Sequence, residues 1–166
     1  MLVIGIDPGT ATTGYGFIQA NEDGSLQAIE FGVIETSPKF PPHQRLLVIY
    51  RQLQKLINLH QPGSGAVEKL FFQRNVKTAI SVGQGRGVAM LALAQAGIPM
   101  EEYSPLEIKQ AVAGYGRADK FQMQNMVKAL LSLVDIPSPD DAADALAVAI
   151  CHIHSKKLKT LIDGTE

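Results

Sequence analysis

The sequence LVIGIDPGT, residues 2–10, joins an apolar, mostly β-branched run to a carboxylate and then to a Pro-Gly pair. A run of this kind bounded by turn residues predicts a buried strand. The strand would end at Asp7, which places the carboxylate on a rigid element but outside the core. Because an unpaired buried carboxylate is costly, Asp7 is either a turn residue that accepts hydrogen bonds from loop amides or part of a charged site.

Turn residues and hydrophobic periodicity predict the elements that surround this strand. Further strands are expected at 15–20, 26–35, 66–68 and 99–103, and helices at 41–59, 75–96, 105–113, 119–133 and 138–157. The hairpin signal at residues 21–24 makes the first three strands an antiparallel meander. This order of elements predicts an α/β fold with one mixed five-stranded sheet and helices on both faces.

Length and composition fit one domain with a sizeable core, since 46% of the 166 residues are hydrophobic. We expect a single domain over residues 1–158 and a short tail over 159–166. The 15 Lys and Arg residues nearly balance 16 Asp and Glu residues, so any DNA binding would depend on local patches. A single cysteine, no signal peptide and no apolar run near membrane-helix length predict a cytoplasmic protein without membrane association.

Three further acids stand where burial alone would not favour a charge. Glu68 ends the predicted strand 66–68, as Asp7 ends the first strand. In the last helix, Asp140 and Asp141 fall in the first turn, where the helix dipole favours acids, but Asp144 lies deeper in an alanine-rich segment. Helical spacing puts Asp141 and Asp144 on one face. A surface role for Glu68 and a buried salt bridge for Asp144 are the structural alternatives.

Two strand-end acids and an Asp-x-x-Asp pair on a helix could meet at one edge of the sheet. Four carboxylates raise one another's pKa unless cations lie among them. Oxygen ligands in this number suit Mg²⁺ or Mn²⁺, and two such ions about 4 Å apart are a common device for phosphodiester hydrolysis. No cluster with zinc-ligand spacing competes, and His152 and His154 are expected on the surface of the last helix.

Basic side chains gather after Glu68. Between Lys69 and Met100 the chain carries four basic residues and no acid, namely Lys69, Arg74, Lys77 and Arg86. Lys109, Arg117 and Lys120 follow at loops or helix ends. Scattered bases usually form a solvated face, but this clustering favours a cationic rim beside the acids. Of the adjacent Phe71 and Phe72, one is expected in the core and the other to stack on an unpaired base.

The predicted helix 75–96 contains Gly83, Gly85 and Gly87, each costing about 1 kcal/mol in a helix interior relative to Ala. Either this helix is bent or broken, or the glycines allow close packing against another backbone, such as that of a second subunit. Their spacing is not a dinucleotide fingerprint, and the chain has no phosphate-binding loop with Gly-Lys-Ser/Thr. No nucleotide cofactor is therefore expected.

Five segments resemble, in order, the motifs of the RuvC family of Holliday-junction resolvases. They are IGIDPGTATTGYG (4–16), AVEKLFFQRNVKTA (66–79), SVGQGRGVAM (81–90), YSPLEIKQAVAGYGRADK (103–120) and DDAADALAVAICHIH (140–154). The resemblance implies a ribonuclease H-like fold, a homodimer and a role in recombination and DNA repair. It implies paired symmetric nicks in four-way junction DNA, dependence on Mg²⁺ (two ions per subunit, with Mn²⁺ as a substitute), and a branch-migration helicase complex as partner.

The resemblance also assigns residues by position. The four metal-binding carboxylates of the family match Asp7, Glu68, Asp141 and Asp144, which selects Asp141 over Asp140. Phe71 matches the aromatic residue that reaches the junction centre, and Lys109 and Lys120 match lysines that contact DNA. With the basic segment, the expected DNA-binding residues are Phe71, Arg74, Lys77, Lys109 and Lys120. The glycine-rich helix resembles the helix through which the family forms dimers.

Two alternative functions follow from the same residues. A phosphotransferase of the actin and sugar-kinase type also has the sequence Asp-x-Gly-Thr after a strand. Such a protein forms its nucleotide cleft between two related domains, whereas 166 residues supply only one. A non-catalytic junction-binding module would keep the fold and lose the chemistry, although all four acids are present. Metal-dependent nicking separates this module from the enzyme.

Overall fold

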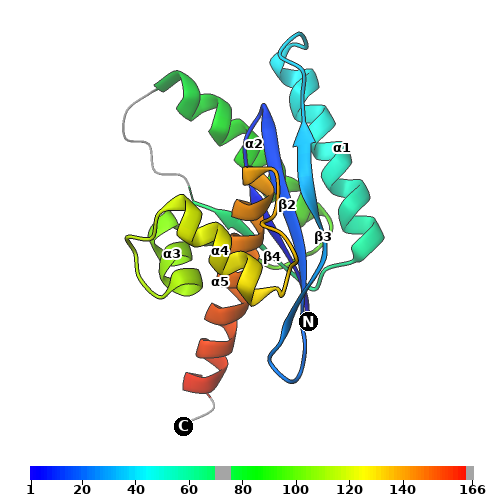
Figure 1. The fold of residues 1–166 in the computed structure, drawn as a ribbon. Coiled ribbons are helices and arrows are strands. Elements are labelled where there is room, and N and C mark those ends of the chain that lie inside the picture. Colours follow the sequence, from blue (N-terminus) through cyan, green and yellow to red (C-terminus); the bar gives the residue numbers. More distant parts are fainter. Residues whose placement is uncertain (70–75, 164–166) are drawn as a thin grey trace.

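A mixed five-stranded sheet forms the centre of the computed structural model, which describes residues 1–69 and 76–163 (Figure 1). The strands are β1 (Leu2–Asp7), β2 (Thr12–Ala20), β3 (Leu26–Glu35), β4 (Ser64–Glu68) and β5 (Met100–Tyr103), in the order β3-β2-β1-β4-β5. The first three strands pair antiparallel, whereas β4 runs parallel to both β1 and β5. The expected antiparallel opening and five-stranded mixed sheet are confirmed.

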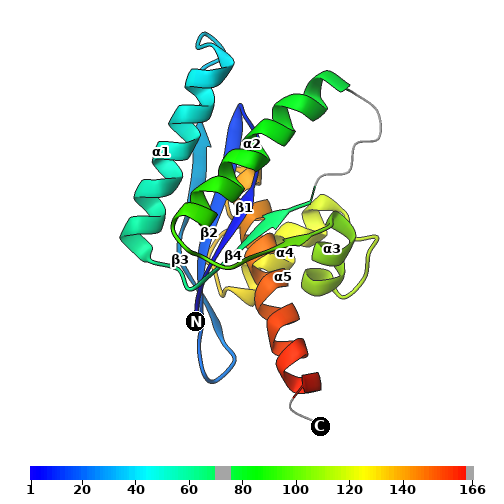
Figure 2. The same cartoon turned by 180° about the vertical axis from the view of Figure 1, so that it is seen from behind.

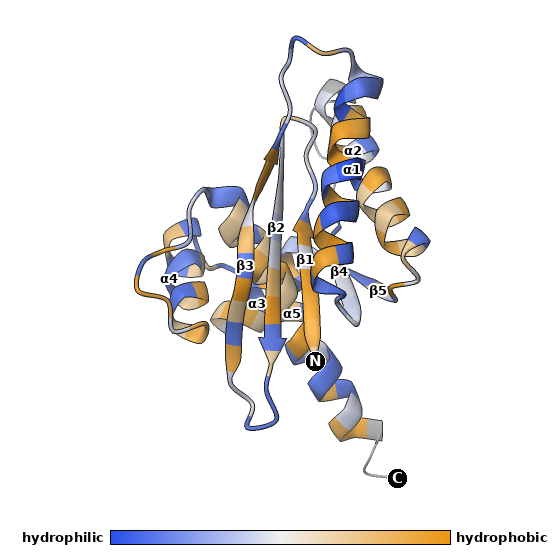
Figure 3. Ribbon diagram, turned by 90° about the vertical axis from the view of Figure 1, so that its right-hand side faces the viewer, coloured by the Kyte–Doolittle hydropathy of each residue, from blue (hydrophilic) through white to orange (hydrophobic). Residues whose placement is uncertain are grey.

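Helices cover both faces of the sheet. The helices are α1 (Pro42–His60), α2 (Val76–Gln95), α3 (Pro105–Ala113), α4 (Lys120–Leu130) and α5 (Asp140–Asp163). One core cluster joins α1 and α2 to the sheet, and a second joins α3, α4 and α5 to its other face (Figures 1 and 2). The hydropathy colouring is apolar along most of β1, which lies between these two layers (Figure 3).

Glycines in β1 and β2 let α5 lie directly on the sheet. A Cβ atom built on Gly5 would overlap the carbonyl oxygen of Ala145, and one built on Gly14 would overlap the carbonyl oxygen of Asp141. At Gly16 the added atom would lie 2.7 Å from a methyl carbon of Leu146. The backbone of α5 therefore occupies the volume that side chains would fill, and this fixes the distance between α5 and the two strands.

Three helices differ from their predicted form, and the first of these, α4, ends at Leu130 rather than residue 133. The last helix starts at Asp140 rather than residue 138, because the Pro139 carbonyl accepts the first helical hydrogen bonds, from the amide of Ala142 at 3.0 Å among them, and it continues to Asp163 rather than residue 157. The helix α2 is continuous across its glycines, so the broken-helix alternative is wrong. A Cβ on Gly85 would lie 3.2 Å from the Gly9 backbone, which supports the close-packing alternative within this chain.

A buried polar network joins α5 to β4 and β5. The imidazole of His152 is fully buried, with Nε2 2.6 Å from Ser64 Oγ and Nδ1 3.0 Å from the Tyr103 hydroxyl. Lys156 Nζ donates to Ser64 Oγ at 2.9 Å. Burial lowers the pKa of His152 to about 4, so the ring is neutral near pH 7. The expectation that His152 lies on the helix surface is wrong, whereas His154 is partly exposed.

Replacing His152 by Leu is expected to lower the free energy of unfolding by about 2 kcal/mol or more, because Ser64 and Tyr103 would lose a buried hydrogen-bond partner. Urea unfolding followed by circular dichroism measures this change. His43→Leu, at an exposed position of α1, serves as the control and should stay close to the wild type. An unchanged midpoint for His152→Leu would mean that the network does not stabilise the fold.

No helix within residues 1–69 and 76–163 is both long enough and apolar enough to cross a membrane.

Candidate active site

Strand geometry places Asp7 and Glu68 side by side on one face of the sheet. They end the neighbouring parallel strands β1 and β4. Val3 in β1 and Ala66 in β4 both belong to the core cluster beneath α5, whereas Ile6 belongs to the cluster beneath α1 and α2. Since side chains alternate along a strand, Asp7 shares the face of Val3, and Glu68 shares the face of Ala66. Both carboxylates therefore lie on the α5 side.

The helix α5 brings the other two acids to the same edge. Asp7 pairs with Gly14 across β1 and β2, and the backbone of Asp141 lies directly over Gly14. Asp144 follows one turn later on the same face of α5, next to the strand ends. Three elements that are distant in the sequence thus contribute Asp7, Glu68, Asp141 and Asp144 to one region.

The acids interact strongly with one another. Burial, and then the charges of Glu68 and Asp144, raises the pKa of Asp7 to about 8. A side-chain hydrogen bond between Asp7 and Glu68 also raises the pKa of Asp7 and opposes the rise in the pKa of Glu68. Burial also raises the pKa of Glu68 and of Asp144, and for Asp144 the nearby Lys120 opposes this shift. Without a cation, this edge of the sheet therefore retains protons that isolated carboxylates would release.

The metal-free protein should become less stable as pH rises. The pKa of Asp7 is about 8 in the folded protein against 3.8 for an isolated group, so between these values the folded state binds more protons than the unfolded state. The free energy of unfolding then decreases with rising pH, by on the order of a few kcal/mol in total. Glu68 and Asp144 act in the same direction because the pKa of each is also raised.

Thermal unfolding in EDTA at several pH values between about 4 and 8 measures this dependence. The Asp7→Asn variant has no titrating group at this position, so its melting temperature should fall less over the same pH range. Equal pH dependence in the variant and the wild type would rule out Asp7 as the origin of the effect.

The donor atoms suit a hard divalent cation, although they do not converge on one point. In the part of the chain that the structure describes, no three His, Cys, Asp or Glu side chains are placed to hold one metal ion. Because carboxylates repel one another, their side chains stay apart when no cation lies between them. All four acids offer oxygen ligands, which Mg²⁺ and Mn²⁺ prefer. A cation would also favour the deprotonated form of Asp7, whose pKa is raised in its absence.

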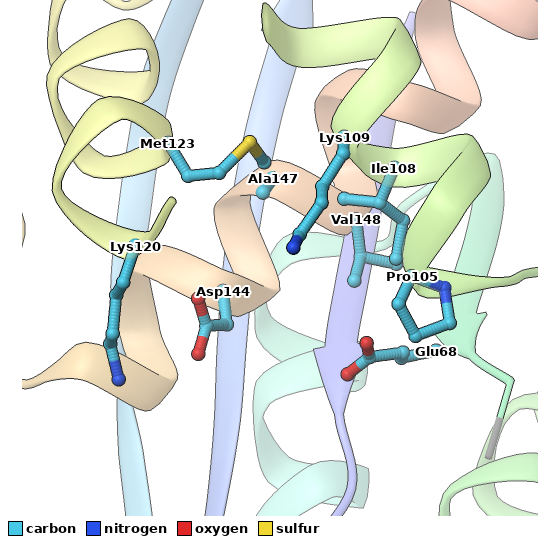
Figure 4. Close-up of a pocket in the computed structure, with 9 residues that line it drawn as sticks. All are labelled: Glu68, Pro105, Ile108, Lys109, Lys120, Met123, Asp144, Ala147 and Val148. Atoms are coloured by element: carbon cyan, nitrogen blue, oxygen red, sulfur yellow. The ribbon is translucent and has the colours of Figure 1, made fainter. Parts of the chain in front are cut away.

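A cavity of about 190 Å³ opens beside the acids (Figure 4). Its polar lining consists of Glu68, Asp144, Lys109 and Lys120, from four different elements. Its apolar lining consists of Pro105, Ile108, Met123, Ala147 and Val148. In Figure 4 the Lys109 ammonium points toward the space between Asp144 and Glu68, and the Lys120 ammonium lies on the other side of Asp144. The cavity therefore presents two cations and two carboxylates to any group that enters it.

Capping boxes define where the two lysine-bearing helices begin. Ser104 caps α3 with Glu107, and Asp119 caps α4 with Gln122, whose amide nitrogen donates to the Asp119 carboxylate at 2.8 Å. The second cap makes Lys120 the first residue of α4. These reciprocal hydrogen bonds satisfy the free amides of each helix start and hold the backbone that carries the lysines.

The other expected site residues are not assembled here. Phe71 and Arg74 lie outside the described residues, as do Phe72 and the side chain of Lys77. Arg86, expected in the cationic rim, instead pairs with Glu102 of β5, its Nε donating to Oε1 at 2.7 Å. The rim hypothesis overlooked this acid because it follows the basic segment in the sequence.

The sequence reasoning also missed a partner of Lys120. The ammonium of Lys120 lies 2.6 Å from Asp140 Oδ2, and Gln124 Nε2 donates to Asp140 Oδ1 at 2.8 Å. This pairing raises the pKa of Lys120 and lowers that of Asp140. The spacing of Lys120 and Gln124, four residues apart on one helix, is a signal that could have indicated a shared partner.

Comparison with known proteins places these features in a family. A family model described as "Crossover junction endodeoxyribonuclease RuvC" matches residues 3–152. The protein of that name from Desulfitobacterium hafniense is 54% identical over 164 residues, 99% of each chain. The one from Chloroflexus aurantiacus is 57% identical over 155 residues, 93% of this chain and 94% of the relative.

Two solved structures agree with this result. The structure of Thermus thermophilus RuvC has a TM-score of 0.90 at 34% identity, covering 96% of this chain and 98% of that one. The T. thermophilus RuvC in complex with a Holliday junction substrate has a TM-score of 0.88 at 32% identity with the same coverage. The expected ribonuclease H-like fold is confirmed, and the chain belongs to the RuvC family of crossover junction endodeoxyribonucleases.

Proposed function

We propose that this protein is a structure-selective DNA endonuclease that resolves four-way (Holliday) junctions by paired symmetric nicks, in recombination and DNA repair. The observation that carries the proposal is the cavity where Glu68 and Asp144 face Lys109 and Lys120, beside Asp7. This combination serves phosphodiester hydrolysis, because carboxylates can hold divalent cations and ammonium groups can meet the phosphate. We further propose a cytoplasmic setting and a nuclease domain over residues 1–158.

In the proposed mechanism, Asp7, Glu68, Asp141 and Asp144 hold Mg²⁺, two ions per subunit, with Mn²⁺ as a substitute. A metal held by these carboxylates would supply charge neutralisation at the phosphate and a lower pKa for the attacking water. Lys109 points between Asp144 and Glu68 and so can contact the scissile phosphate (Figure 4). Lys120 neutralises charge that develops on the phosphate or holds the DNA backbone. Pro105, Ile108, Met123, Ala147 and Val148 form the apolar wall of the cavity beside these groups.

The remaining proposed DNA contacts are Phe71, Arg74 and Lys77. They follow Glu68 closely in the chain. A basic, aromatic segment of this kind binds backbone phosphates and stacks on unpaired bases. A branch-migration helicase complex is the proposed protein partner, on the grounds of family membership.

We propose a homodimer formed through α2, because two symmetric nicks require two sites related by a two-fold axis. Four residues spaced along one side of α2 support this surface, namely Ile80, Gln84, Gly87 and Leu91. Ile80 is 61% exposed and Leu91 is 57% exposed, and the space above Gly87 is open. A glycine between two exposed apolar residues allows two helices to approach closely.

Leu91→Glu is expected to convert the dimer into monomers and to abolish paired nicking, since a charge at an apolar interface is costly. Sedimentation velocity measures the oligomeric state. Val134→Glu is a matched control, because Val134 is 88% exposed and lies on the connection between α4 and α5, on the other face of the sheet. A dimer that survives Leu91→Glu would exclude this surface.

The experiment that tests the function is cleavage of a synthetic mobile four-way junction with Mg²⁺ or with EDTA, beside the Asp144→Asn variant. We expect symmetric paired nicks that require both the metal and Asp144. Tight junction binding without nicks under any divalent ion would favour a non-catalytic binding module. Stabilisation by a nucleotide, without cleavage, would instead favour a phosphotransferase.

A further inference from the structure

Asp140 makes two directed contacts although it is not among the four acids proposed to hold metal. One carboxylate oxygen lies 2.6 Å from the ammonium of Lys120, and the other accepts a hydrogen bond from Gln124 at 2.8 Å. The position of Asp140 in the first turn of α5 accounts for an acid there, since the helix dipole favours it. It does not account for a carboxylate that is bound on both oxygens by side chains of α4.

The Lys120 ammonium lies close to acids other than Asp140, and this makes its pairing with Asp140 important. Lys120 lines the same cavity as Glu68 and Asp144, and the charges of Asp144 and Asp141 act on it. An ammonium on a flexible stem is drawn toward unpaired carboxylates. If Lys120 moved among these acids, it would neutralise them and occupy the place of a cation.

The arrangement of the side chains keeps Lys120 at the edge of the cavity. In Figure 4 its ammonium lies on one side of Asp144, and Glu68 lies on the other. Asp140 pairs with the ammonium in this position, and Gln124, which is on the same helix as Lys120, donates to the other oxygen of the Asp140 carboxylate. Both Lys120 and Asp140 are exposed, so their ion pair adds little to overall stability.

We propose that Asp140, oriented by Gln124, is a positioning residue that holds the Lys120 ammonium at the rim of the cavity and so prevents it from competing with a divalent cation for Asp144. This inference rests on the proposed metal site. Asp140 then affects the affinity for a cation only through Lys120. The Lys120 ammonium stays at the rim of the cavity, where a phosphate would enter.

A double-mutant cycle on the DNA-free protein tests the proposal. Mn²⁺ binding is measured by electron paramagnetic resonance for the wild type, Asp140→Asn, Lys120→Met and the double variant. We expect Asp140→Asn to weaken Mn²⁺ binding about three- to fivefold when Lys120 is present, the size typical of an exposed charge pair. In the Lys120→Met background, the same substitution should change binding by less than about twofold, because no ammonium remains to enter the cavity.

Two further variants serve as controls. Asp140→Glu keeps the charge and should retain wild-type affinity. Asp135→Asn changes net charge equally at an exposed position on the connection before α5, and should have little effect. Equal weakening by Asp140→Asn in both backgrounds, or none in either, would overturn the inference while leaving the metal site intact. Absence of saturable Mn²⁺ binding in the wild type and in Lys120→Met would overturn the metal site and this inference together.

Discussion

Asp7→Asn should abolish cleavage of a four-way junction while leaving junction binding intact. The substitution keeps the size of the side chain and removes one carboxylate from the group that includes Glu68. Loss of a metal-binding carboxylate removes several kcal/mol of transition-state stabilisation, so the single-turnover rate should fall on the order of 10³-fold or more. The cationic side chains proposed to contact DNA are unchanged, so affinity should remain.

Single-turnover cleavage at saturating protein and a gel-shift titration in EDTA separate these two effects. Asp23→Asn, at a fully exposed acid in the turn between β2 and β3, is the matched control and should cleave like the wild type. If Asp7→Asn still turned over at the same metal concentration, Asp7 would have no part in the site.

Gly14→Ala is expected to cost about 3 kcal/mol of stability or more, because its new methyl group would overlap the carbonyl oxygen of Asp141. To remove the overlap, α5 must move away from β2, and this movement carries Asp141 and Asp144 away from Asp7. Stability and cleavage should therefore fall together, even though Gly14 itself has no functional group.

Urea unfolding and junction cleavage measure the two losses for Gly14→Ala. Gly63→Ala is the matched control, because the nearest atom to its added carbon lies 4.0 Å away, at ordinary van der Waals distance. A Gly14→Ala protein with a wild-type unfolding midpoint would mean that α5 is not held by contact with the β2 backbone.

Much of the fold and part of the site could be predicted from local patterns. The run before Asp7 and the run before Glu68 are strands, and alternation along them puts both acids on one face. The choice of Asp141 over Asp140 came from the family resemblance, because both residues suit the first turn of a helix. The functional roles of these residues, and those of Phe71, Arg74 and Lys77, remain predictions.

Interactions between distant residues escaped prediction. His152 was expected on the surface because its partners, Ser64 and Tyr103, lie 88 and 49 residues away in the sequence. Asp140 was explained by the helix dipole alone, since its pairing with Lys120 depends on how α4 packs against α5. Both cases have the same physical cause: the hydrogen-bond or ion-pair partner of a polar residue in a helix lies on another element that packs against it.

The position of α5 in the chain also bears on when the protein becomes active during its synthesis. Every other described element precedes α5, yet α5 carries Asp141 and Asp144 and covers β1 and β2. A nascent chain on the ribosome therefore holds Asp7 and Glu68 alone until α5 has emerged and docked. A chain synthesised only as far as α4 would therefore carry Asp7 and Glu68 without Asp141 and Asp144, and the face of the sheet that α5 covers would be open.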